Sequence, residues 1–110
     1  MRYRDVVPIS REEAEVVFVD GDETSVCDAL VRLVYHDKDW KYAQEKCIHF
    51  LTSSNPSVRG LAVTCLGHLA RVHGKLDVEK VLPLLLELRN DPEVSGRVSD
   101  TLDDVETYLK

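Results

Sequence analysis

The stretch NPSVRGLAVTCLGHL, residues 55–69, determines the predicted fold. Asn55 is a strong helix cap, and the fixed φ of Pro56 suits the first position of a helix. Apolar residues then recur at intervals of three and four, namely Val58, Ala62, Leu66, Leu69 and Val72. Because this spacing places them on one face, we predict an amphipathic helix over 55–72 that ends at Gly74.

Five further helices are predicted from the same two signals, a capping residue and apolar residues at helical spacing. Their approximate ranges are 11–19, 23–36, 39–52, 77–88 and 91–109. The valines of the first range would also suit a strand, but a single strand would have no pairing partner. The stretch 81–88 is apolar almost all round, which predicts that its helix is the central and most buried element.

The segment that begins at Asn55 recurs 36 residues later, beginning at Asp91. Residues of the same kind occupy equivalent positions, namely Asn55, Pro56, Val58, Gly60, Leu66 and Leu69 in the first copy and Asp91, Pro92, Val94, Gly96, Leu102 and Val105 in the second. The preceding helices correspond at a shift of 37, with Cys47, Ile48 and Leu51 falling on Leu84, Leu85 and Leu88. The repeating unit is therefore a helix pair, and a looser match places a degenerate pair before the two clear ones.

In this repeat the chain resembles HEAT repeats, in which the second helix opens with an Asp-Pro or Asn-Pro turn, a Val-Arg pair and a small residue. Residues 55–69 match this pattern, whereas the second copy has Ser95 in place of the arginine. Three stretches also resemble a group of stand-alone bacterial HEAT-like proteins, namely residues 36–51, 58–74 and 96–109. That group includes immunity proteins of contact-dependent or polymorphic toxin systems. The resemblance covers about residues 10–110 and implies an all-α fold, a short α-solenoid of about three antiparallel helix pairs.

Two kinds of residue in the repeat predict how neighbouring pairs meet. Gly60 and Gly96 carry no Cβ and are expected to allow close helix approach. Arg59 resembles the inter-repeat ladder residues of HEAT proteins. We therefore expect it to pair with an acidic residue of a neighbouring turn, Asp91 or Asp22.

The composition is typical of one folded domain. The chain has 110 residues, of which 44% are apolar and 31% charged, and we expect a single domain over 1–110 with residues 1–9 as an N-terminal extension. No apolar stretch approaches the ~20 residues of a membrane span, and no secretion signal is visible. Cys27, Cys47 and Cys65 suit reduced thiols, so the expected location is the cytoplasm of a bacterium or a eukaryote.

The net charge of −6 is concentrated at the two ends of the chain. Residues 10–28 contain seven acids and one base, residues 91–110 contain six acids and two bases, and residues 38–89 contain eight bases and five acids. Phosphate backbones repel a net negative protein, so direct nucleic-acid binding is not expected. An acidic surface suits a basic protein partner, although it could also serve solubility alone. We expect a monomer or a weak dimer.

No group of residues predicts catalysis, a metal or a cofactor. Cys47 and His49 are two residues apart and point to different sides of a helix. Cys65 and His68 could share a face, but no CxxC or HxxxH pair supplies the other ligands of a structural zinc. The chain also lacks a glycine-rich phosphate loop. We therefore expect a protein without enzymatic activity.

The candidate partner-binding residues are polar side chains on the predicted second helices that do not fit the apolar stripe. They are Asp28, Arg32, His36, His68, Arg71, Asp100, Asp103, Asp104 and Thr107. The leading hypothesis is an immunity protein whose acidic surface covers the basic active site of a cognate toxin, for example a nuclease. The alternative is a HEAT-repeat scaffold or regulatory adaptor that binds a housekeeping protein. A third possibility, an enzyme built on such repeats, lacks any visible site.

Overall fold

The structure, a computed structural model, describes residues 6–109 and contains six α-helices and no strand within that range. The helices are α1 (Arg11–Asp20), α2 (Glu23–His36), α3 (Trp40–Phe50), α4 (Pro56–His73), α5 (Val78–Leu88) and α6 (Ser95–Tyr108). The predicted all-α class and the number of helices are confirmed. The alternative of a strand at the valines of α1 is wrong for this chain, because residues 11–20 form a capped helix.

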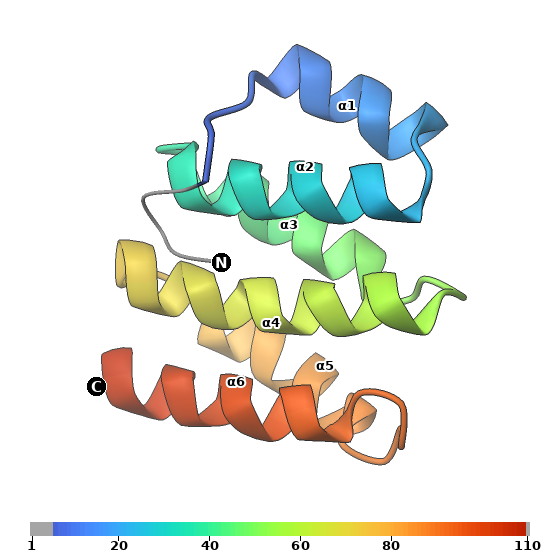
Figure 1. Cartoon of the computed structure of the whole chain (residues 1–110). Coiled ribbons are helices and arrows are strands. Elements are labelled where there is room, and N and C mark those ends of the chain that lie inside the picture. The colour runs from blue at the N-terminus through green and yellow to red at the C-terminus, as the bar shows by residue number, and fades with distance from the viewer. Residues whose placement is uncertain (1–5, 110) are drawn as a thin grey trace.

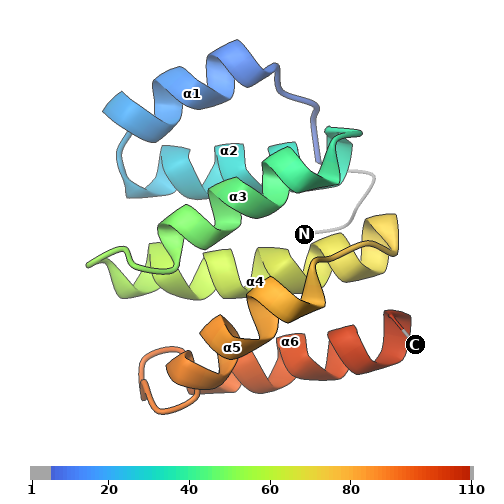
Figure 2. The ribbon, with the colours of Figure 1, turned by 180° about the vertical axis from the view of Figure 1, so that it is seen from behind.

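The helices are stacked as antiparallel pairs (Figures 1 and 2). The second helix of each pair, α2, α4 or α6, lies beside the next in one layer, and all three run in the same direction (Figure 1). Seen from behind, α3 and α5 cross that layer (Figure 2). Helix α4 packs against α2 on one side, against α6 on the other, and against its own partner α3. The described chain measures 31 × 29 × 24 Å along its principal axes.

Helix α4 is the most buried element of the described chain. Its buried residues are Val58, Gly60, Ala62, Val63, Cys65, Leu66, Gly67, Leu69 and Ala70. They occupy more than one face because α4 has neighbours on three sides. Small residues at several of these positions let the neighbouring helices approach closely.

Helix α5 was expected to be the central, most buried element, and this prediction is wrong. Only Val81 and Leu85 of α5 are buried, while Leu86 is 38% exposed and Pro83 is also exposed. Its apolar composition does not fix its position, because α5 lies in the last pair of the stack and only one of its sides meets the core. Leu84 and Leu88 of α5 contribute to a surface groove.

Capping side chains begin five of the helices. The side-chain oxygens of Ser10, Asp22, Asp39, Asn55 and Asp77 each accept a backbone N–H from the first turn of the following helix. Helix α4 ends at Gly74, whose φ of 61° lies in the left-handed region that glycine adopts without strain.

The start of α6 differs from the prediction. The helix was expected to begin at Asp91 and Pro92, but it begins at Ser95, after a turn over residues 91–94. The carboxylate of Asp91 explains the difference, because its Oδ1 accepts the N–H of Glu93 while its Oδ2 accepts from Arg59. Asp91 therefore closes a turn and joins two pairs, and it does not cap α6.

Arg59 links neighbouring pairs as predicted. Its Nε lies 3.0 Å from Asp91 Oδ2, and its Nη1 donates to the carbonyl of Ser53 at 2.9 Å. Gly60 also behaves as predicted, because a Cβ at this position would lie 2.8 Å from the Arg97 side chain. The same expectation for Gly96 is wrong, since nothing lies within 4 Å of a Cβ built there.

Candidate protein-binding surface

Five of the predicted binding residues come together in a cleft between α4 and α6. The α4–α6 cleft has a volume of about 430 Å³ and is lined by Thr64, His68, Arg71, Asp100, Thr101, Asp103 and Asp104. It opens on the layer formed by the second helices. The sequence had placed these residues on two helices but could not show that the helices are neighbours.

Gly67 and Thr101 shape the wall of the cleft. A Cβ at Gly67 would lie 2.8 Å from Oδ2 of Asp104, so the missing side chain lets that carboxylate lie against α4. The hydroxyl of Thr101 is buried and donates to the carbonyl of Val63 at 2.9 Å. This bond holds α6 against α4 and leaves the aspartates at the opening.

His68 is neutral near pH 7. Burial, and then the neighbouring Arg71 guanidinium, lower the pKa of His68 to about 4. Arg71 donates a hydrogen bond to Nδ1 of the His68 ring, and the hydroxyl of Tyr35 lies 3.4 Å from the same nitrogen. The guanidinium of Arg71 is therefore bound to a neutral ring.

The other predicted residues do not join this cleft. On α2, Arg32 donates to the carbonyls of Val7 and Pro8, each at 2.8 Å, and pairs with Asp28 at 3.3 Å. His36 contacts the carbonyl of Val6, whose side chain is only 5% exposed. Thr107 is exposed near the end of α6.

These contacts show that Arg32 and His36 bind residues 6–8 of their own chain, while their predicted part in partner binding stays a prediction. Residues 1–5 of the predicted extension lie outside the described part of the chain. The described part of the predicted extension therefore packs on α2.

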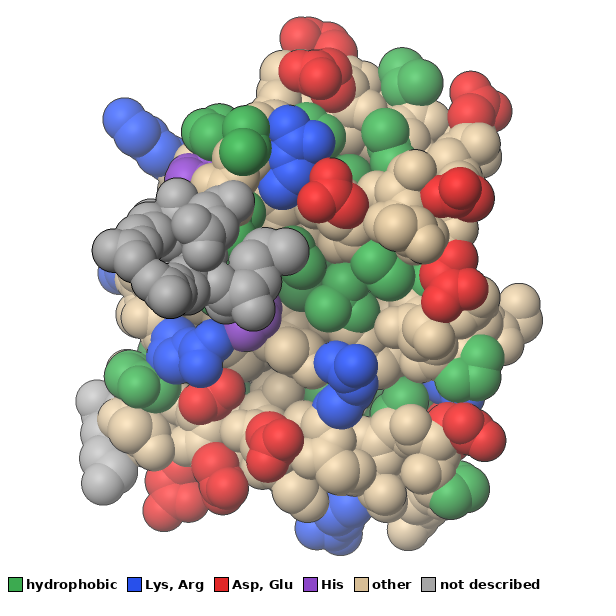
Figure 3. Space-filling view, in the orientation of Figure 1, with side chains coloured by type: hydrophobic (Ala, Val, Ile, Leu, Met, Phe, Trp, Pro, Cys, Tyr) green, Lys and Arg blue, Asp and Glu red, His purple; other side chains and the backbone are tan. Residues whose placement is uncertain are grey.

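Acidic side chains are unevenly distributed on the face formed by the second helices. In the space-filling view they gather at the top and right, over α1 and the beginning of α2, and again at the lower left over α6 (Figure 3). Arginine and lysine side chains lie between these regions (Figure 3). The two acidic ends of the sequence thus correspond to two ends of the stack.

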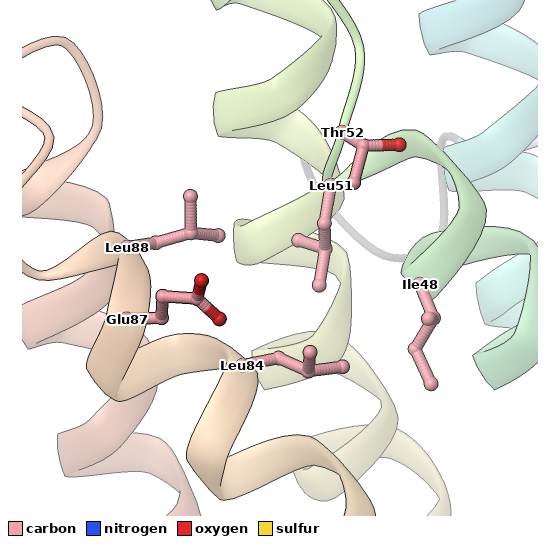
Figure 4. Close-up of a pocket in the computed structure, with 6 residues that line it drawn as sticks. All are labelled: Ile48, Leu51, Thr52, Leu84, Glu87 and Leu88. Carbon is pink, nitrogen blue, oxygen red and sulfur yellow. The ribbon is translucent and has the colours of Figure 1, made fainter.

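The opposite face has an apolar groove that the sequence analysis missed. The α3–α5 groove, of about 210 Å³, is lined by Ile48, Leu51, Thr52, Leu84, Glu87 and Leu88. The leucines and Ile48 point into the gap between the two helices, with the Glu87 carboxylate beside them (Figure 4). The repeat at a shift of 37 was the signal, because it places Leu51 and Leu88 at equivalent positions of neighbouring helices.

The cysteines are not placed for nucleophilic chemistry. Cys47 and Cys65 are fully buried. Burial and contact with Cys65 raise the pKa of the Cys47 thiol, and burial raises that of Cys27, so both stay protonated. Among residues 6–109 no group of three or more His, Cys, Asp or Glu side chains is arranged to hold a metal ion.

None of the helices in the described range combines the length and the apolar character that a bilayer-spanning segment requires.

Comparisons with known proteins agree with the repeat. The family model for the HEAT repeat matches residues 44–73, from the middle of α3 to the end of α4. No curated protein matches the chain. A chain in the crystal structure of a CDI complex from Cupriavidus taiwanensis LMG 19424 is 34% identical, with a TM-score of 0.87, over 100% of this chain and 99% of that chain. With this identity over its full length, the chain belongs to the same family of HEAT-repeat proteins as that chain of the Cupriavidus taiwanensis complex.

Proposed function

We propose that this protein is an immunity protein of a contact-dependent growth inhibition (CDI) system, which neutralises a cognate toxin by binding it. The observation that carries the proposal is the full-length match, at 34% identity, to a chain of a CDI complex. The HEAT repeat supports it, because stacked helix pairs present extended surfaces that bind other proteins. The toxin meets the protein in the cytoplasm.

The proposed mechanism is occlusion without catalysis. One copy of the protein covers the active site of one toxin domain with the face formed by α2, α4 and α6. The acidic regions at the two ends of that face favour a basic toxin, such as a nuclease, because complementary charge accelerates encounter and disfavours other partners. Burial raises the pKa of the Cys47 thiol, which favours a role in packing over nucleophilic chemistry and so supports binding as the mechanism.

Coexpression tests the proposal. The chain is produced with the toxin domain encoded in the adjacent reading frame, and both growth and copurification are measured. We expect a one-to-one complex and restored growth. A toxin that neither binds the chain nor loses its toxicity would sink the proposal.

Stoichiometry separates occlusion from enzymatic inactivation. Toxin activity is titrated with the purified chain, and we expect full inhibition only when the two are equimolar. When the complex is denatured, the two chains are separated and the toxin is refolded, the toxin should be active again. Inhibition of many toxin molecules by one copy would show turnover and would exclude the occlusion mechanism.

A further inference from the structure

The α4–α6 cleft holds three carboxylates that the described chain does not neutralise. Asp100, Asp103 and Asp104 make no ion pair or hydrogen bond with any residue in the range 6–109. By contrast, Asp91, in the turn before the same helix, is paired with Arg59. The cleft is therefore a place on this face where negative charge gathers without a partner among residues 6–109.

The position of these aspartates on α6 is unfavourable in the free protein. Asp103 and Asp104 follow Asp100 by three and four residues, so that each is a like-charged neighbour of Asp100 on one face of the helix. Asp103 and Asp104 also lie in the second half of α6, toward the end where the helix dipole disfavours negative charge, and the last turn contains no base. A surface that keeps such an electrostatic cost is expected where a binding partner supplies the compensating charge.

The two arginines beside the cleft do not relieve this repulsion. Arg71 donates to the neutral ring of His68, and Arg97 donates to the hydroxyl of Thr64 at 2.9 Å. Both guanidinium groups thus bind neutral acceptors at the edge. The volume of about 430 Å³ between α4 and α6 remains open, with carboxylates at its rim.

We propose that the α4–α6 cleft receives an arginine side chain of a basic protein partner, bound chiefly by Asp103 and Asp104. This inference rests on the proposed function and names the chemistry of the partner at that surface. An arginine is favoured over a lysine because its planar guanidinium donates paired hydrogen bonds to carboxylates. Gly67 fixes the place of Asp104, since any side chain at residue 67 would displace that carboxylate.

The test uses the complex with the toxin domain encoded in the adjacent reading frame. The cleft variant, Asp103→Asn/Asp104→Asn, is compared with a matched control, Glu79→Gln/Glu87→Gln. The control removes the same number of negative charges, but from α5. We expect association at low salt to slow about tenfold for the cleft variant and to change less than about twofold for the control. The thermal midpoint of the free cleft variant should equal or exceed that of the parent chain, because the repulsion on α6 is removed.

A double-mutant cycle identifies the partner residue. Asp104→Asn is combined in turn with a glutamine substitution at each arginine of the toxin domain. One arginine should be coupled to Asp104, and its replacement by lysine should retain only part of the coupling. Gly67→Ala should weaken the same coupling.

The outcomes separate this inference from the proposed function. If the parent chain forms no complex with the adjacent toxin domain, both are overturned. If the complex forms and protects cells, but the cleft variant associates normally and no arginine couples to Asp104, the cleft inference alone is overturned. Slower association of the control variant would place the interface at the α3–α5 groove, which Glu87 lines.

Discussion

Arg59 joins the second and third helix pairs. Its guanidinium is bound at once by Asp91 in the next turn and by the carbonyl of Ser53 in its own pair, and its side chain is only 15% exposed. We expect Arg59→Ala to lower the free energy of unfolding by about 2 kcal/mol, because two charge-assisted contacts are lost and Asp91 is left unpaired. Urea denaturation measures the loss.

Arg11 is the matched control for this prediction. It also pairs with aspartates, Asp37 and Asp39, but its side chain is 47% exposed. Arg11→Ala should therefore cost less than Arg59→Ala. Equal losses for the two variants, or additive effects of Arg59→Ala and Asp91→Ala, would contradict the assigned role of the Arg59 contact.

His68 predicts a dependence of stability on pH. In the folded chain its pKa is lowered to about 4 by burial and by Arg71, whereas an unfolded chain has the ordinary value of 6.5. Between these values the unfolded state binds the extra proton, so the free energy of unfolding falls as the pH decreases from 6.5 toward 4. Well above pH 6.5 His68 is neutral in both states, and its titration no longer changes the free energy of unfolding.

The measurement compares the free energy of unfolding of the parent chain with that of His68→Gln at several pH values. The effect of carboxylates that titrate in the same range is common to both chains and cancels in the difference. The parent chain should lose more stability than the variant between pH 6.5 and 4. An NMR titration of the His68 ring with a midpoint near 6.5 would refute the prediction.

Helix α5 contains adjacent leucines with opposite environments. Leu85 is fully buried, while Leu86 is 38% exposed. We expect Leu85→Ala to cost about 2–5 kcal/mol through the cavity it leaves in the core. Leu86→Ala should cost less than about 1 kcal/mol. Chemical denaturation of the two variants distinguishes a peripheral α5 from a central one, in which both losses would be large.

Local signals in the sequence predicted most of the helices. Asn55 and Asp77 cap the helices that follow them, and Gly74 ends α4, because each acts on backbone groups within one turn of itself. The position of α5 and the start of α6 were predicted wrongly. Both depend on contacts between distant residues, such as that of Arg59 with Asp91, which no local pattern contains.

The candidate site could be predicted only in part, for the same reason. His68 and the aspartates of α6 were identified as polar residues off the apolar stripes, and the packing of α4 on α6 brings them into one cleft. Arg32 carries the same sequence signal, yet its guanidinium binds the carbonyls of Val7 and Pro8. A polar side chain on a helix face gives the same sequence pattern whether it binds a partner protein or another part of its own chain.

At the scale of the whole molecule, stability should be distributed unevenly along the stack. Helix α4 is covered by three helices, whereas α1 packs mainly on α2 and exposes Val16 and Val19. Native-state hydrogen exchange should therefore be slowest for amides in the middle of α4 and faster for those of α1. Uniform protection across the six helices would instead indicate that the stack opens as a single unit.

The aspartates of the α4–α6 cleft also matter for how such a protein can evolve. Because they have no bonding partner within residues 6–109, replacing them costs the folded state little. Descendants of one gene could therefore exchange these residues freely and acquire new partner preferences one substitution at a time. The inner face of α4 has no such freedom, so lineages should diverge in the cleft while that helix stays nearly constant.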